Sequence, residues 1–147
     1  DDRDPDRTDI LHEYFVSPER FPDFLEVCRR IIPASYQEFL NVTLRYIDTD
    51  PDSVLAYAPV PRIAAVMSFS QEMSACAEAD MARMTRELIE AITDIGGTYY
   101  LPYRPHATVT QFARAYPRAI EFAEAKRVLD PDLTFRNALW DTYLEPL

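Results

Sequence analysis

Apolar residues recur along the chain with two different spacings, which predict strands and helices in turn. Residues 10–16 alternate as in a half-buried strand. Ser17-Pro18-Glu19 then has the composition of a helix start, with Ser at the N-cap and Pro at the first helical position. Apolar residues follow at spacings of three and four, which predicts a helix that ends at Pro33. Its apolar stripe consists of Phe21, Phe24, Leu25, Cys28, Ile31 and Ile32.

The segment 39–47 (FLNVTLRYI) has the clearest strand pattern. Side chains of a strand point to alternate faces, so two rows are expected. One row is apolar and contains Leu40, Val42, Leu44 and Tyr46. The other is polar and contains Asn41, Thr43 and Arg45. Residues 48–53 have the composition of a turn, and further strands are predicted over 54–58 and 62–71.

The second half of the chain predicts a long helix, a strand and two shorter helices. Ser74 can cap a helix that runs to Ile95, and Gly96 lies where a left-handed residue ends such a helix. A strand bent by Pro102 is expected over 98–103. Thr108-Val109-Thr110-Gln111 matches a capping box that opens a helix to Tyr116. A last helix over 118–129 and a compact tail (FRNALWDTYL) follow.

This order of elements predicts an α+β fold: an antiparallel sheet with helices packed on one face, as in a split βαβ or ferredoxin-like core, plus C-terminal helices. The other sheet face would be free. Asn41, Thr43 and Arg45 belong on it, because the apolar row must meet the helices. Residues 1–9 (DDRDPDRTD) are interpreted as a charged tail or linker remnant, and residues 10–147 as a single domain.

Composition excludes several functional classes. The net charge of −10 disfavours nucleic acid as a partner, since such binders usually present a basic face. The two glycines, Gly96 and Gly97, are adjacent, so neither a dinucleotide-binding turn nor a phosphate-binding loop can be formed. The sequence lacks an apolar run of the length that a transmembrane helix needs. We expect a cytoplasmic protein, with membrane association left open.

Two groups of residues could carry chemistry. The polar row of Asn41, Thr43 and Arg45 is either an ordinary solvated sheet face or the floor of a binding pocket, in which Arg45 supplies charge and planar donors. The segment 99–108 (YYLPYRPHAT) gathers three tyrosines, Arg104 and His106 between stiffening prolines. His106 is either structural or a proton acceptor near neutral pH.

Several ordered motifs resemble one family. GGTYYLPYRPHAT, QFARAYPRAIEFAEAKRVLDP and FRNALWDTYL are similar to the C-terminal part of FAD-linked oxidases of the vanillyl-alcohol oxidase type, in the sugar-lactone and alditol oxidase-like branch. HEYFVSPERFPDFLEVCR resembles the start of the same substrate (cap) domain, and NVTLRYI its central strand. The likeness extends from about Leu11 to Leu144.

The resemblance implies an enzyme that oxidises a CH–OH group of a sugar, sugar lactone or polyol by hydride transfer to flavin. FAD would be held mainly by an N-terminal domain that is absent from this sequence. Arg45 matches a pocket arginine of the alditol-type oxidases, whereas Thr43 stands where that branch has an acidic residue. Arg104-Pro105-His106 matches an R-P-H element whose His lies close to the reacting carbon and the flavin.

The resulting expected site has three parts. His106 and Arg45 are the expected catalytic residues. The expected substrate-binding residues are Asn41, Thr43, Tyr103, Arg104 and Thr108. The expected cofactor contacts are Arg104, His106 and Asn137, the last being matched by the F-x-N run at Phe135 to Asn137.

An alternative of a different class stays open at this point. The chain could be a stand-alone ferredoxin-like module that binds a small ligand or dimerises through its open sheet, without catalysis. The sequence immediately upstream of Asp1 would distinguish the two hypotheses, because the oxidase needs a further domain of its own there.

Overall fold

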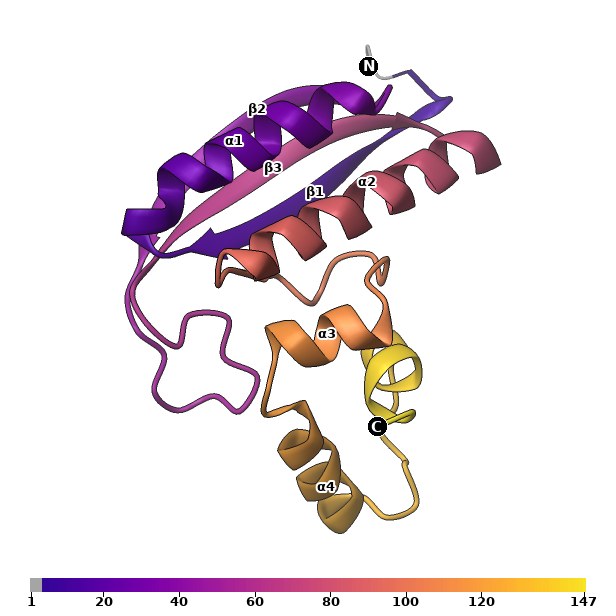
Figure 1. Ribbon diagram of the computed structural model, residues 1–147. Helices are drawn as coiled ribbons and strands as arrows, with labels where there is room; N and C mark the ends of the chain where they lie inside the picture. Colours follow the sequence, from indigo (N-terminus) through magenta and orange to yellow (C-terminus); the bar gives the residue numbers. More distant parts are fainter. Residues whose placement is uncertain (1–3) are drawn as a thin grey trace.

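One antiparallel sheet of four strands, in the order β2-β3-β1-β4, organises the chain (Figure 1). The structure is a computed structural model that describes residues 4–147. The predicted α+β class is confirmed, including the insertion of β3 between β1 and β2 that defines the split βαβ core. The strands are β1 (Arg7–Val16), β2 (Glu38–Ile47), β3 (Arg62–Glu72) and β4 (Thr98–Tyr99). The helices are α1 (Phe21–Ile31), α2 (Ala75–Asp94), α3 (Val109–Ala115) and α4 (Ala119–Leu129).

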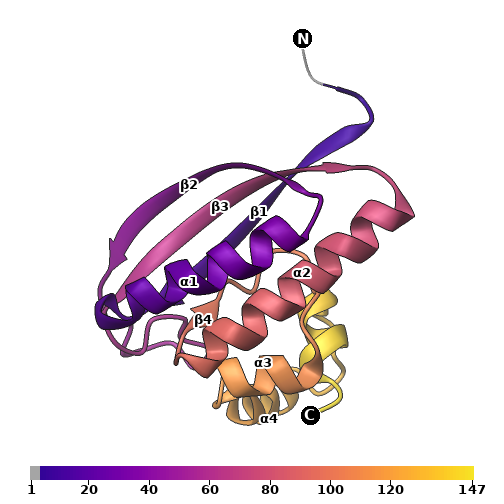
Figure 2. The ribbon, with the colours of Figure 1, turned by 45° about the horizontal axis from the view of Figure 1, so that its top comes forward.

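Helices α1 and α2 lie side by side on one face of the sheet, as predicted (Figure 2). Their apolar sides meet the sheet in a core that includes Phe24 and Ile31 of α1 and Met84 of α2. The predicted stripe of α1 is partly wrong, because Val27 is buried while Leu25 is 38% exposed. Phe24, Val27 and Ile31 are three and four residues apart, so they share the inward face. A short 3₁₀ turn over Pro18–Arg20 precedes the helix.

The register of the sheet confirms most of the predicted faces of β2. Val42 lies opposite Met67 and Leu44 opposite Ala65, and both partners belong to the helix-side core. Asn41, Thr43 and Arg45 therefore project from the other face, which we call the open face. The prediction for Leu40 is wrong, because a bulge between Phe39 and Asn41 shifts the alternation and puts Phe39 on the helix side instead.

Strand β2 is the edge of the sheet, and the helices cover it poorly. Val42 is 43% exposed and Leu44 is 51% exposed, although both are on the helix side. Alternation gives the face of a residue, whereas burial depends on how far the helices reach across the sheet.

Three predicted boundaries differ from the structure. Strand β1 begins at Arg7, whose guanidinium bonds Ser70 and Glu38, so residues 7–9 belong to the sheet and not to a tail. Residues 1–3 of the predicted tail lie outside the described part of the chain. The predicted strand 54–58 is part of a loop over 48–61. The strand expected over 98–103 ends at Tyr99, because β4 pairs only with Tyr14 and Phe15.

The predicted helix ends after residue 70 are confirmed. Ser74 caps α2 by accepting a hydrogen bond from the Ala77 N–H, and Gly96 has a φ of 77°. Thr108 and Gln111 form the complete capping box of α3. The C-terminal segment folds back onto α3 and ends in a π-helical turn over Trp140–Leu144. Within residues 4–147, no helix is both long and apolar enough to cross a membrane.

Candidate functional site

The open face presents polar groups on β2 and β1, with Val66 of β3 between them. Thr43 of β2 lies opposite Val66 of β3, and Val66 lies opposite Glu13 of β1. Glu13 is thus in line with Thr43, and Arg45 is two residues further along β2. Asn41, Thr43 and Arg45 are exposed, and none of their side chains is hydrogen bonded within residues 4–147. We call Glu13, Asn41, Thr43, Arg45 and the adjacent Tyr103 the open-face site.

Glu13 is not among the site residues expected from the sequence, although the alternation of β1 contains a signal for it. Residues 10–16 alternate, with Ile10, His12 and Tyr14 on the helix side. The residues between them must share the other face with the polar row of β2. The sequence does not show which strands are neighbours. The pairing of β3 with both β1 and β2 places Glu13 in line with Thr43.

Aromatic side chains form a wall at one end of the open face. Tyr57, from the loop after β2, stacks on Phe15 with ring centroids 4.5 Å apart. Tyr100 contacts Tyr57 edge-on at 5.7 Å and Tyr103 at 5.4 Å. The Thr98 hydroxyl donates to the Tyr57 carbonyl, which ties the loop to β4. Offset and edge-on contacts of this kind fix ring orientations, so the wall presents Tyr103 to the site in a defined direction.

The charges of the open-face site influence one another. Partial burial raises the pKa of Glu13, and the Arg45 guanidinium opposes this rise. Burial also raises the pKa of Tyr103, with the Glu13 carboxylate adding to the effect and Arg45 acting against it. A carboxylate, a guanidinium and a phenol are therefore close enough for their charges to interact, although they form no direct hydrogen bond.

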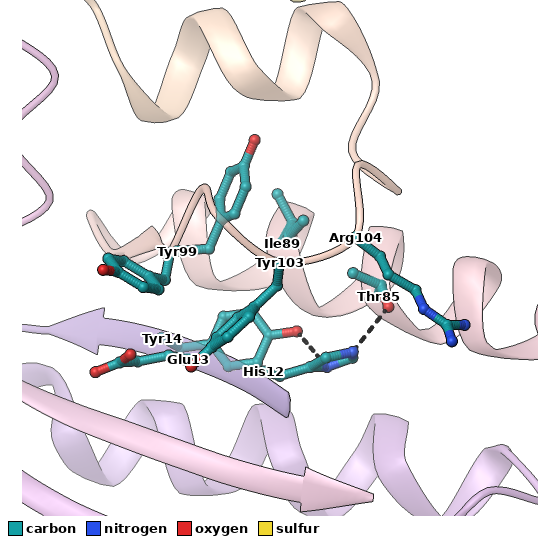
Figure 3. A pocket seen from close by; sticks show the side chains of 9 residues that line it. His12, Glu13, Tyr14, Thr85, Ile89, Tyr99, Tyr103 and Arg104 are labelled. Atoms are coloured by element: carbon teal, nitrogen blue, oxygen red, sulfur yellow. Dashed lines mark hydrogen bonds between the residues drawn. The ribbon is translucent and has the colours of Figure 1, made fainter. Parts of the chain in front are cut away.

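Tyr103 lines three adjoining hollows. The smallest, of about 20 Å³, lies between β1, α2 and the segment after β4, and has room for one water molecule (Figure 3). The second, of about 440 Å³, runs along the edge of β1 beside Leu11 and Arg104. The third, of about 330 Å³, lies against the C-terminal segment and includes Asn137. The two larger hollows have the size of small-molecule sites.

His106 belongs to a separate cluster on the helix side. Its Nε2 lies 2.7 Å from the Glu78 carboxylate and its Nδ1 3.3 Å from the Thr85 hydroxyl, both groups belonging to α2. Arg104 donates to the same Glu78 carboxylate, which also accepts from Gln71 at 2.9 Å. These donors outweigh desolvation and lower the pKa of Glu78. The cluster therefore anchors the segment that carries Tyr103 onto the start of α2.

Hydrogen-bond accounting shows that both ring nitrogens of His106 are engaged. Thr85 donates its hydroxyl hydrogen to the Met81 carbonyl at 2.7 Å, so the hydroxyl accepts from the histidines. His106 then donates from Nδ1 to Thr85, and its Nε2 faces the Glu78 carboxylate. With 8% of its surface exposed, His106 has no nitrogen free for a substrate.

His12 continues this network into the core (Figure 3). Its Nε2 lies 3.3 Å from the Thr85 hydroxyl, and the Tyr14 hydroxyl donates to its Nδ1 at 3.1 Å. Burial, with smaller contributions from the charges of His106 and Arg104, lowers the pKa of His12 to about 3. His12 is therefore neutral at physiological pH.

The structure brings together only part of the expected site. Arg45 and His106, the expected catalytic pair, are on opposite sides of the sheet. Thr108 uses its hydroxyl to cap α3, and the side-chain oxygen Oδ1 of Asn137 accepts the Trp140 N–H at 2.9 Å, so both side chains have structural partners. Asn41, Thr43, Arg45 and Tyr103 do share one surface.

No protein-family model matches the chain, and no curated protein matches it.

Proposed function

We propose that this chain is the substrate-binding (cap) domain of an FAD-dependent oxidoreductase that oxidises a CH–OH group of a sugar, sugar lactone or polyol. The observation that carries the proposal is the open face: hydrogen-bonding groups with no partners within residues 4–147, beside an aromatic wall that orients Tyr103. Hydroxylated compounds both donate and accept hydrogen bonds, which matches this mixture of groups.

The residues fit contact with a substrate and one side of a flavin, but not the binding of a whole FAD. Gly96 and Gly97 lie at the C-terminal end of α2, where the helix dipole is negative and repels phosphate. A Cβ at Gly97 would meet the Ile92 side chain at 2.6 Å and the Phe15 carbonyl at 2.8 Å, so this glycine serves close packing. The proposal therefore places the pyrophosphate in another domain of the same protein.

FAD, when bound, would supply the acceptor for a hydride. The chain's own residues position the substrate. Arg45 donates to the substrate oxygen and stabilises the negative charge that develops on it as the hydroxyl proton passes to solvent water. Asn41 and Thr43 bind further hydroxyls, and the aromatic wall with Tyr103 excludes water from one side. The His106 cluster holds the Tyr103 segment in place from the helix side of the sheet.

The test uses the natural protein that contains this chain, purified without added cofactor. We expect it to be yellow, with the absorption spectrum of a flavin, and expect anaerobic addition of sugars or polyols to bleach that spectrum. A colourless protein that binds no FAD when the cofactor is added would refute the proposal and favour a stand-alone module.

A further inference from the structure

We propose that Glu13 is a specificity-determining residue of the open-face site, which pairs with Arg45 to select neutral hydroxylated substrates over anionic ones. This inference rests on the proposed function for the identity of the reaction, but the binding claim can be tested separately. The sequence pattern of β1 alone does not distinguish Glu13 from an ordinary solvated acid. The evidence for its role is the set of residues that surround it on the open face.

The geometry places Glu13 at binding distance from Arg45 for a ligand that lies across the sheet. Neighbouring strands are about 4.8 Å apart, and residues advance about 3.4 Å along a strand. Glu13 and Thr43, separated by one strand, are therefore about 10 Å apart between Cα atoms, and Glu13 and Arg45 about 12 Å. Val66, the residue between them, is apolar and half-buried, so it leaves the two charged side chains free to converge above it.

Both charged groups lack an ion-pair partner in the described part of the chain, although many arginines there are paired. Arg83, Arg114 and Arg136, for example, each contact two carboxylates. Arg45 and Glu13 interact only through space, together with Tyr103. A pair held apart in this way can accept a ligand between its members without first breaking a salt bridge.

The paired charges determine which ligand fits. A hydroxyl group can donate to the Glu13 carboxylate while a neighbouring oxygen accepts from Arg45, and each of these hydrogen bonds is strengthened by the charge. A ligand carboxylate would be attracted by Arg45 but repelled by Glu13. The site as a whole is electrically balanced, so it favours neutral polyols and sugars over sugar acids.

The test compares sorbitol with gluconate, which have the same carbon skeleton but differ in charge. Dissociation constants are measured by calorimetry on the natural protein under anaerobic conditions. For Glu13→Gln we expect sorbitol to bind about tenfold to a hundredfold more weakly, as is typical for losing a hydrogen bond to a charged group. Gluconate should bind more tightly to the Glu13→Gln variant than to the wild type, because the negative charge that opposes its carboxylate is removed while Arg45 remains.

Glu26→Gln is the matched control, since Glu26 is an exposed acid on α1 that pairs with Arg29. It should leave both affinities unchanged. A general loss of structure in the Glu13→Gln variant would weaken the binding of both ligands. The proposal requires the two affinities to shift in opposite directions. Unchanged affinities in Glu13→Gln, a wild type that prefers gluconate, or binding of neither compound would overturn it.

The two proposals fail in different ways. A flavin-free protein that still binds sorbitol through Glu13 would refute the proposed function and leave this inference standing. A flavoprotein whose Glu13→Gln variant keeps the preference for sorbitol would refute only this inference.

Discussion

Replacement of His12 by Gln should make the protein's stability less sensitive to a fall in pH from 7.5 to 5, by about 2 kcal/mol. His12 is 6% exposed and is held between the Tyr14 and Thr85 hydroxyls. Its pKa is lowered from 6.5 to about 3 in the folded protein. The unfolded chain therefore binds a proton at His12 between pH 6.5 and pH 3, while the folded chain does not, and stability falls as the pH falls through this window.

The magnitude follows from the two pKa values. At pH 5 the unfolded chain gains about 2 kcal/mol from protonation of this one side chain, against less than about 0.1 kcal/mol at pH 7.5. Carboxylates contribute little over this range, because their pKa values in the unfolded chain lie near 4. The change is a large part of the stability of an ordinary domain.

The assay is urea unfolding at a series of pH values, followed by circular dichroism. Gln keeps an amide for the Thr85 hydroxyl but does not titrate, so the His12→Gln protein should lose about 2 kcal/mol less than the wild type on going to pH 5. Its absolute stability is irrelevant to this comparison. His12→Asn provides a second variant, and the reasoning is refuted if both variants keep the slope of the wild type.

Three further predictions concern packing and helix ends. Phe112→Ala should lower the free energy of unfolding by about 3–5 kcal/mol, because this fully buried ring stacks on Tyr143 at 4.8 Å and joins α3 to the C-terminal segment. The control Phe135→Ala, at a ring that is 78% exposed, should change it by less than about 0.5 kcal/mol. Thr108→Ala should cost about 1 kcal/mol through loss of the capping box, and Thr110→Ala, an exposed neighbour, much less; thermal melting distinguishes them. Gly97→Ala should cost about 1–3 kcal/mol, since two of the three nearest atoms are backbone carbonyls that cannot move aside, and a melting temperature equal to that of the wild type would contradict this.

Local patterns are sufficient for the order of the helices and strands, apart from the predicted strand 54–58, and for most of the helix ends. The Ser74 cap, the left-handed Gly96 and the Thr108 capping box each depend on residues within one or two turns, and all are present. Alternation also placed Asn41, Thr43 and Arg45 on the open face. These features depend on neighbours in the sequence, so the sequence contains what is needed to predict them.

Features that depend on tertiary contacts were predicted less well. The bulge at Leu40 interrupts an otherwise regular alternation and is visible only in the pairing of β2 with β3. The sequence pattern predicts Tyr57 in a strand, whereas Tyr57 lies in a loop and stacks on Phe15. His106 and Arg45 are separated because the chain passes around the edge of β1 between Tyr103 and His106. The spacing of apolar residues contains no information about this path. Glu13 joins the site because β3 lies between β1 and β2.

The central claim, that the open face of the sheet is the substrate side, is tested most directly by the rate of flavin reduction in single-turnover experiments on the natural protein. Arg45→Ala should slow reduction by about a hundredfold to a thousandfold, as expected for loss of one donor to a developing negative charge. Arg29→Ala, at an exposed arginine of α1, should leave the rate unchanged. An Arg45→Ala protein that is reduced as fast as the wild type would contradict the claim.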